Sequence, residues 1–404
     1  MEKKPPRYYY GWVIVAVSFL TLFIALSARF SFGVFYVAIL DEYGWGRGET
    51  AAAFSIAMLV HALFSPVSGY LVDRFSPRRL FPLGAAFLTI GLVAAHHIKS
   101  IWHLYLYFGV IIAIGINSIG FGPHAAIVSR WFIRKRGFAT GLTMAGVGLG
   151  NLVLVPLIGL MINAFGWRNA FLAIAAIIFC IIIPATAIFQ RRSPEEMGQL
   201  PDGIDPGPEG GPSLSIKHTS ETTRSPDSAG GWTFFGALST PSFWWLVLVV
   251  FCHGFVTNML VVHQVVHVVD AGYSRILAAS LLGLVGLLSS AGGIFFGFLS
   301  DRVGRETGFT LAGCICFLGI CQILFVRDTA STLLLYGFVT FYGLGNGAIG
   351  TIYASTMWDL FPGKALGRLM STLSIGIFSL WMVAPRRRLS PNTRHPSSQA
   401  ISGK

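Results

Sequence analysis

Long apolar stretches without any Asp, Glu, Lys or Arg recur along the chain, and they constrain its fold more than any other feature. A helix rises 1.5 Å per residue, so about 20 such residues cross the hydrocarbon core of a membrane. The sequence therefore predicts an all-α polytopic membrane protein. Its eleven candidate spans are residues 11–28, 50–72, 80–98, 101–129, 137–167, 169–190, 230–269, 276–300, 307–326, 329–358 and 369–385.

The composition supports this interpretation. Of the 404 residues, 54% are hydrophobic and 11% are charged, which is too few charges to cover a soluble surface of this size. The formal net charge of +12 comes from basic residues in short loops, which is typical of cytoplasmic loops and does not indicate nucleic-acid binding. No metal or other cofactor is expected, because the cysteines lie inside apolar stretches without metal-ligand spacing. They are Cys180, Cys252, Cys314, Cys316 and Cys321.

A short motif occurs twice, each time between two apolar stretches. Gly69 precedes Asp73-Arg74, Gly297 precedes Asp301-Arg302, and further arginines follow each pair. A glycine at the end of a membrane helix lets a neighbouring backbone come close, and an aspartate can meet the positive N-terminus of an adjacent helix. The alternative is an ordinary basic loop, but the same motif would then have to occur by chance twice at matching places in the two halves. We therefore expect a gating role for Gly69, Asp73, Arg74, Gly297, Asp301 and Arg302.

This repeated motif resembles the cytoplasmic loop signature of the major facilitator superfamily of transporters. The resemblance implies the major facilitator fold, with two six-helix bundles around a central site, and transport by rocking of one bundle against the other. Other segments resemble bacterial monocarboxylate-transporter-like and oxalate/formate-antiporter-like carriers, which implies a small organic anion as substrate. These segments are residues 29–35, 44–45, 131–141, 166–168, 194–198 and 263–272.

The chain departs from those carriers inside the membrane. The eukaryotic monocarboxylate carriers have an Asp and an Arg inside the eighth span, and the oxalate carriers use basic residues in the eighth and eleventh. Here residues 276–300 and 369–385 contain no charge. Direct transfer of either substrate mechanism to this chain is therefore not supported.

Arg29 is the strongly basic residue inside an otherwise apolar span of the first half. On insertion scales an Arg near the bilayer centre costs about 2.5 to 3.5 kcal/mol, so it should not face lipid. One interpretation is an anion-binding guanidinium in the central cavity; the other is a structural partner for Asp41, Glu42 or helix carbonyls. Four more polar positions are predicted either to bind substrate or to join helices by hydrogen bonds. They are Asn117, His124, Asn151 and Asn346.

His263, His267 and Asp270 follow one another at intervals of four and three residues, so they share one face of a helix. A zinc hydrolase would need a glutamate at position 264 as general base, and Gln264 cannot serve. Two interpretations remain open. The cluster is either a proton-coupling group or gate, because histidine titrates near neutral pH, or a solvated vestibule face.

Glycines recur at positions 141, 146, 148 and 150. No Walker lysine follows them, so they do not form a phosphate loop and nothing indicates ATP as the energy source. The pattern instead predicts close helix packing.

The distribution of Lys and Arg predicts the topology. The loops at residues 74–79 and 130–136 are basic, and the alternate loops are poor in basic residues. This places the N-terminus, the repeated loops and the central linker in the cytoplasm of a cell bound by this membrane, with a bacterial inner membrane as the expected location. The predicted parts are an N-terminal six-helix bundle at 1–190, a flexible linker at 191–230, a C-terminal bundle with five candidate spans at 231–385 and a basic tail at 386–404.

The C-terminal tail disagrees with this topology. Eleven crossings would place Arg386, Arg387 and Arg388 on the side that should be poor in basic residues. A frameshift that replaces the twelfth helix after Ser379 would explain both the missing span and the change of composition. The alternative is an adapted eleven-helix carrier.

Together these features predict a secondary active transporter of a small organic anion, a monocarboxylate or dicarboxylate, working by alternating access as a monomer in the lipid bilayer. Protons or a counter-substrate are the expected partners. The alternatives are an efflux carrier for lipophilic compounds and a truncated membrane protein or sensor that does not transport. An enzyme is not expected, since neither Gly-x-Ser-x-Gly nor His-Glu-x-x-His occurs.

Overall fold

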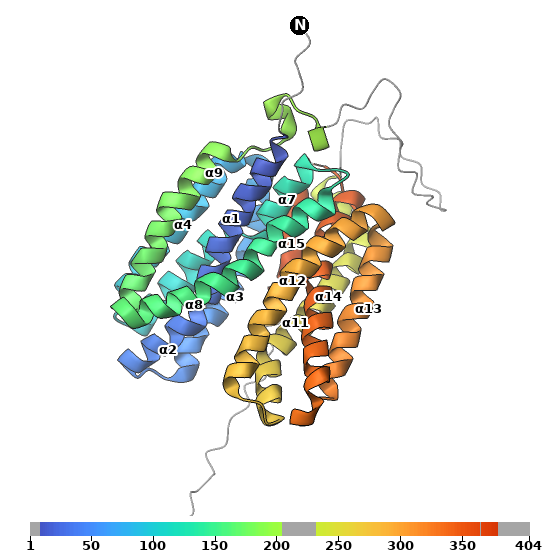
Figure 1. The fold of residues 1–404 in the computed structure, drawn as a ribbon. Coiled ribbons are helices and arrows are strands. Elements are labelled where there is room, and N and C mark those ends of the chain that lie inside the picture. Colours follow the sequence, from blue (N-terminus) through green and yellow to red (C-terminus); the bar gives the residue numbers. More distant parts are fainter. Residues whose placement is uncertain (1–8, 204–231, 364, 379–404) are drawn as a thin grey trace, which may run out of the picture.

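The computed structural model describes residues 9–203, 232–363 and 365–378. Within these ranges every regular element is a helix, which confirms the all-α prediction. Figure 1 shows two groups of long helices that lie against each other. The predicted basic tail and the proposed frameshift lie outside the described residues.

The first group of helices comes from the N-terminal half of the chain. Its long helices coincide with the apolar stretches, because a membrane-spanning backbone must satisfy its own hydrogen bonds. They are α1 (Gly11–Phe30), α2 (Phe32–Tyr43), α3 (Arg47–Arg74), α4 (Pro77–His96), α5 (Ile101–Leu104), η1 (Tyr105–Ile112), α6 (Ala113–Ser118), α7 (Phe121–Trp131), α8 (Arg136–Ile177), η2 (Ile178–Ile182) and α9 (Ile183–Phe189).

The second group comes from the C-terminal half. Its last helix, α15, begins where the eleventh candidate span was predicted and is described as far as Phe378. The elements are α10 (Phe234–Leu238), α11 (Pro241–Asp270), α12 (Arg275–Val303), α13 (Arg305–Leu324), η5 (Thr329–Ser331), α14 (Thr332–Leu360) and α15 (Leu366–Phe378).

Eight helical stretches of the described residues are long and apolar enough to cross a membrane. One of them, Arg136–Phe189, contains two predicted spans. Gly166 separates these two, because its φ of 81° and ψ of 158° reverse the chain inside an otherwise helical segment. Only glycine adopts this conformation without strain. The chain is thus a multi-pass membrane protein.

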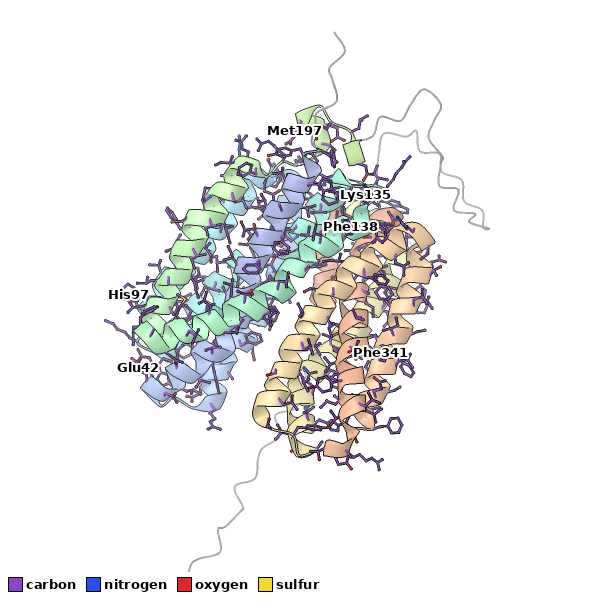
Figure 2. The ribbon with its side chains drawn as sticks, viewed as in Figure 1. Glu42, His97, Lys135, Phe138, Met197 and Phe341 are labelled. Carbon is purple, nitrogen blue, oxygen red and sulfur yellow. The ribbon has the colours of Figure 1, made fainter. Side chains whose placement is uncertain are left out.

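The two halves contact each other mainly along two pairs of helices. Helix α8 of the first half packs along α12 of the second, and α3 of the first half packs along α15. The apolar core of the first half also includes Phe361, Leu366 and Leu369 from the second. Figure 2 labels Lys135 and Phe138 near one end of the molecule, and Glu42 and His97 near the other. Asp73 and Asp301 lie at the end of Lys135 and Phe138, where they bind helix N-termini as described below. We call this end the latch end.

The start of the predicted linker is folded onto the latch end. Residues 191–203 contain two short 3₁₀ helices, η3 (Pro194–Met197) and η4 (Pro201–Gly203). The Asp202 carboxylate accepts hydrogen bonds from the backbone N–H groups of Ile133 and Arg134, at 2.8 and 2.7 Å. Burial raises the pKa of Tyr9, whose hydroxyl donates to the Trp131 carbonyl and accepts from the Asp202 N–H. This part of the sequence lacks periodicity, so its contacts could not be predicted from it.

Candidate functional site

A cavity of about 1070 Å³ lies between the two halves. Its walls come from α1 and α8 on one side and from α11, α12 and α14 on the other. Much of the lining is apolar, including Phe30, Met144, Leu152, Val155 and Pro156. Its polar side chains include Asn151, Thr257, Gln264, Ser289, Tyr342 and Asn346. No charged side chain belongs to the lining as far as the structure describes it.

Small residues of α8 allow this helix to contact both neighbours at once. A Cβ atom at Gly141 would clash with the carbonyl oxygen of Gly293 on α12. A Cβ at Gly146 or Gly150 would meet the carbonyl oxygen of Phe19 or Phe23 on α1. The predicted packing role of these glycines is therefore confirmed. The close approach fixes α8 as the wall between the N-terminal bundle and the cavity.

The first copy of the repeated motif joins α3 to α15. The Asp73 carboxylate accepts hydrogen bonds from the backbone N–H groups of Gly367, at 2.8 Å, and Arg368, at 3.0 Å. These N–H groups belong to the first turn of α15, which intrahelical bonds leave unpaired. Asp73 also forms a 3.0 Å ion pair with Arg130 of α7. We call this arrangement latch 1.

The second copy repeats the arrangement between α12 and α8. The Asp301 carboxylate accepts from the backbone N–H groups of Gly137 and Phe138, both at 2.9 Å. Asp301 pairs with Arg305 at 2.5 Å. We call this arrangement latch 2. In both latches an aspartate of one half caps a helix N-terminus of the other, which confirms the contact predicted from the sequence.

Each latch brings its motif glycine against the opposite helix. A Cβ at Gly69 would clash with the Gly367 carbonyl oxygen, and a Cβ at Gly297 would clash with that of Gly137. The cavity lining begins beyond these contacts, at Gly141 on α8 and Gly293 on α12, and continues toward the opposite end. The halves are thus held together at the latch end, and the cavity lies between the latches and the other end.

Latch 2 is supported by ionic contacts that the sequence did not reveal. Arg136 of α8, whose side chain is 2% exposed, pairs with Asp359 of α14 across the two halves. Asp359 also pairs with Arg305 at 3.0 Å. These partners are more than 50 residues apart, so no local pattern connects them.

The structure separates the five predicted substrate-binding residues into two groups. Asn151 and Asn346 line the cavity from opposite halves. Arg29, Asn117 and His124 are buried inside the N-terminal bundle. The Asn117 side-chain amide donates to the His61 carbonyl at 2.8 Å, and the His124 ring packs on Phe81 at 4.4 Å. These contacts suit residues that join helices.

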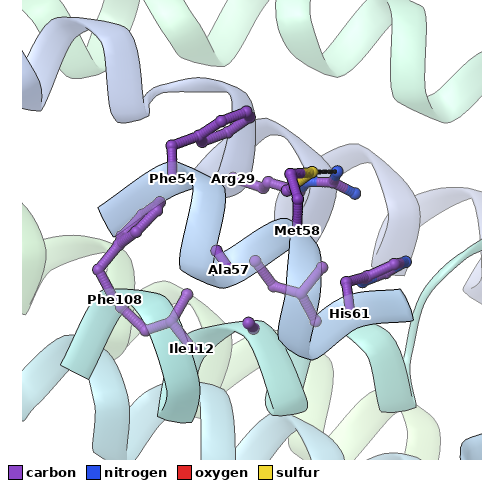
Figure 3. A pocket seen from close by; sticks show the side chains of 9 residues that line it. Arg29, Phe54, Ala57, Met58, His61, Phe108 and Ile112 are labelled. Atoms are coloured by element: carbon purple, nitrogen blue, oxygen red, sulfur yellow. Dashed lines mark hydrogen bonds between the residues drawn. The ribbon is translucent and has the colours of Figure 1, made fainter. Parts of the chain in front are cut away.

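Arg29 belongs to a separate, small pocket of about 10 Å³ beside α3 and α6. Its guanidinium contacts the Met58 sulfur at 3.0 Å, as Figure 3 shows, and the same pocket includes His61. The next residue, Phe30, lines the large cavity instead. Glu42, one of the predicted partners, is bound at 2.6 Å by Arg168. The location of Arg29 favours a structural role in this conformation.

The predicted face of α11 is exposed. His263, His267 and Asp270 are exposed, and His267 Nε2 lies 3.0 Å from the Ile323 carbonyl oxygen. Within the described residues no cluster of His, Cys, Asp and Glu could hold a metal ion. A role of His263, His267 and Asp270 in gating or proton coupling stays a prediction. Gln264, between the two histidines, lines the cavity.

A family model describes this chain over residues 18–385, and that family is the Major Facilitator Superfamily. The chain belongs to this superfamily. The predicted family and fold class are confirmed, and the family is one of transporters rather than enzymes. Two solved structures show the same fold: a XylE mutant with two Trp substitutions, and a variant of the E. coli fucose:proton symporter FucP. Their TM-scores are 0.67 and 0.66 at 15% and 14% identity, covering 92% and 94% of this chain and 87% and 91% of theirs.

Curated relatives are monocarboxylate transporters. Monocarboxylate transporter 12 of Rattus norvegicus is 27% identical over 306 residues, which is 74% of this chain and 62% of that protein. Monocarboxylate transporter 13 of Bos taurus is 27% identical over 377 residues, which is 92% of this chain and 82% of that protein. The chain therefore spans less than two thirds of the first relative's length.

Proposed function

We propose that this protein is a secondary transporter that moves a small organic acid across a membrane by alternating access. The observation that carries the proposal is a large cavity between two halves, with both latches at one end of the described part of the molecule. The names of the relatives, monocarboxylate transporters 12 and 13, support the substrate class.

Latches 1 and 2 supply the gate at one end. A hydrogen bond to a charged group contributes about 1.5 to 3 kcal/mol, and each latch has two bonds from backbone N–H groups to a carboxylate. These hydrogen bonds stabilise the conformation in which the latch end is closed. When the latch end opens, we propose that new contacts at the opposite end offset their loss. Gly69, Asp73, Gly297 and Asp301 are therefore the central gating residues, and Arg74 and Arg302 lie beside them.

The basic loops at the latch end suit the cytoplasmic side of a cell membrane. With that orientation the N-terminus is cytoplasmic, and the cavity faces outward in this conformation. One chain contributes both latches and all described walls of the cavity. This supports the proposal that the transporter works as a monomer.

The substrate contacts lie on both halves. Asn151 comes from α8, and Asn346 from α14, where it is joined to Thr257 by a 2.9 Å hydrogen bond. A ligand that contacts both halves binds differently in the two conformations, and this is how binding drives their exchange. Apolar wall residues such as Leu152 and Val155 would hold its carbon skeleton.

The test is uptake of radiolabelled lactate and oxalate by proteoliposomes that contain the full chain. Parallel samples have an imposed pH gradient or are preloaded with unlabelled acid, and protein-free liposomes are the control. Uptake that a gradient or preloading stimulates supports the proposal and separates proton coupling from exchange. If neither acid nor any other short carboxylate is taken up, while a lipophilic dye is transported, the efflux alternative replaces it.

A further inference from the structure

Three carboxamides line the cavity, and they differ in what they bind. Asn346 is satisfied, because Oδ1 accepts from Thr257 and Nδ2 donates to Ser289 at 3.3 Å. Nε2 of Gln264 and Oδ1 of Asn151 are buried and have no hydrogen-bond partner within the described part of the chain. Gln264 is only 5% exposed. The hydroxyl of Tyr342, which also lines the cavity, is a third such atom. Buried unpaired polar atoms are costly and rare, so three in the lining of one cavity indicate where a ligand binds.

The unpaired amide atoms of Gln264 and Asn151 are chemically complementary, and the Tyr342 hydroxyl can either donate or accept. Nε2 of Gln264 is a donor on the C-terminal half, and Oδ1 of Asn151 is an acceptor on the N-terminal half. An undissociated carboxylic acid has one carbonyl acceptor and one O–H donor, which is the matching pair. A carboxylate has acceptors only, and would leave the Asn151 oxygen unpaired.

The charge of the wall leads to the same conclusion. None of the described lining side chains is charged, and the apolar part of the lining is extensive. An anion enclosed there would lose its water without gaining a counter-ion, and this is strongly unfavourable. A neutral acid loses much less.

Building on the proposed function, we propose that the cavity holds its substrate as the undissociated acid, recognised by Gln264 and Asn151. The carboxyl group takes up a proton on the side where it enters and releases it on the other. One proton thus moves with each carboxylate, on the substrate itself, and no net charge crosses.

Titratable protein groups are not required for this step. The titratable side chain of the described lining is the Tyr342 phenol on α14. On α11 itself, His253, His263, His267 and Asp270 are outside the lining. From α12 and α8 the described lining supplies small, apolar, hydroxyl and amide side chains, such as Gly283, Ser290 and Asn151. The cation Arg29 lies in its separate pocket.

The inference predicts how binding depends on pH. A carboxyl group with an ordinary pKa near 4.3 is undissociated in about one molecule in 500 at pH 7, and this fraction rises about tenfold for each pH unit of acidification. The apparent affinity for an acid should rise by the same factor. A neutral amide should bind equally at every pH.

The experiment uses the purified full chain in detergent and three probes with one carbon skeleton: phenylacetic acid, phenylacetamide and benzylsulfonate. Calorimetric titrations at pH 6 and pH 8 give the affinities. We expect about 100-fold tighter binding of the acid at pH 6, unchanged binding of the amide, and no binding of the permanently ionised sulfonate. Binding of the sulfonate comparable to that of the acid, a pH-independent affinity for the acid, or binding of no probe would overturn the inference.

Two variants test the residues. Gln264→Leu and Asn151→Leu should each lower the affinity for the acid and for the amide about tenfold, as expected for one lost hydrogen bond. Asn163→Leu is the matched control, because Asn163 is an exposed residue of the same helix α8 outside the cavity. If a leucine variant fails to fold, the alanine variant replaces it. Equal affinities in variants and control would contradict the assignment.

The two proposals fail separately. If proteoliposomes take up no carboxylic acid, the proposed function fails whatever the titrations show. If acids are transported but the sulfonate binds as well as the acid, the proposed function stands and only the undissociated form is wrong.

Discussion

The two latches share one design but differ in their support. In each, an aspartate of one half caps a helix N-terminus of the other, and a glycine permits the close approach. Latch 2 adds the ion pair from Arg136 to Asp359, which joins the halves directly. In latch 1, the partner of Asp73 is Arg130, which belongs to the same half.

Latch 1 has weaker contacts across the halves. The Arg368 guanidinium lies 4.3 Å from the centre of the Tyr70 ring, and the Ser65 hydroxyl donates to the Ser371 carbonyl at 2.7 Å. The comparison teaches that the repeated motif sets the geometry of closure, whereas residues outside the motif set its strength. Disruption of latch 2 should therefore have the larger effects.

The largest effect is expected from Gly297→Ala. Its new methyl group would clash with the Gly137 backbone carbonyl, which cannot move without separating α12 from α8. We expect the latch end to open in nearly all molecules and the melting temperature to fall, measured by spin-label distances and thermal unfolding. Gly313→Ala is the matched control, because no atom lies within 4 Å of its new Cβ. If both variants had the same spin-label distances and melting temperatures, Gly297 would not be needed for the close approach of α12 and α8.

Asp301→Asn should have the next largest effect. The amide keeps one acceptor but loses the charge that binds two backbone N–H groups and Arg305. A loss of about 2 kcal/mol corresponds to a roughly 30-fold shift from the closed to the open latch end. The distance distribution between the halves measures this shift. Glu306→Gln, an exposed neighbour at the same end, should change nothing.

Asp73→Asn should also favour the open latch end, but with a smaller effect. We expect the ratio of open to closed molecules to rise about tenfold. The bond from Ser65 to Ser371 and the Arg368 contact with Tyr70 remain in this variant. Substrate affinity should survive, because Asp73 lies outside the cavity lining. A larger effect than that of Asp301→Asn would reverse the ranking of the two latches.

Tyr70→Leu should have the smallest effect. It removes a cation–π contact worth about 0.5 to 1 kcal/mol, which is a two- to five-fold change in the same ratio. Double variants sharpen the comparison. Tyr70→Leu should couple to Asp73→Asn, which belongs to the same latch, and add independently to Asp301→Asn.

Local sequence patterns predicted the features that depend on local chemistry. The Gly-to-Asp-Arg repeat indicated two helix-capping contacts, and the glycines of residues 141–150 indicated close packing; the structure confirms both. The apolar stretches located the helices. Each of these signals lies within about ten residues, where the period of the helix constrains it.

Features that depend on distant residues were not predictable. The pair of Arg136 and Asp359 and the cavity position of Gln264 depend on how remote helices face each other. Arg29 shows the same limit: its burial followed from its charge, but the choice between the central cavity and a pocket beside Met58 depends on the rotation of α1. A single helix does not encode that rotation.

The most direct test measures both ends of the molecule by double electron–electron resonance, after replacement of the five native cysteines. Spin labels at Arg79→Cys and Thr307→Cys report on the latch end, and labels at Lys99→Cys and Arg327→Cys on the opposite end; all four positions are exposed. With both latches intact, the account predicts a short, narrow distribution at the latch end. In the Asp73→Asn and Asp301→Asn double variant the latch-end distance should lengthen while the opposite end shortens. Unchanged distances at both ends in the double variant would contradict the claim that these two latches control access to the cavity.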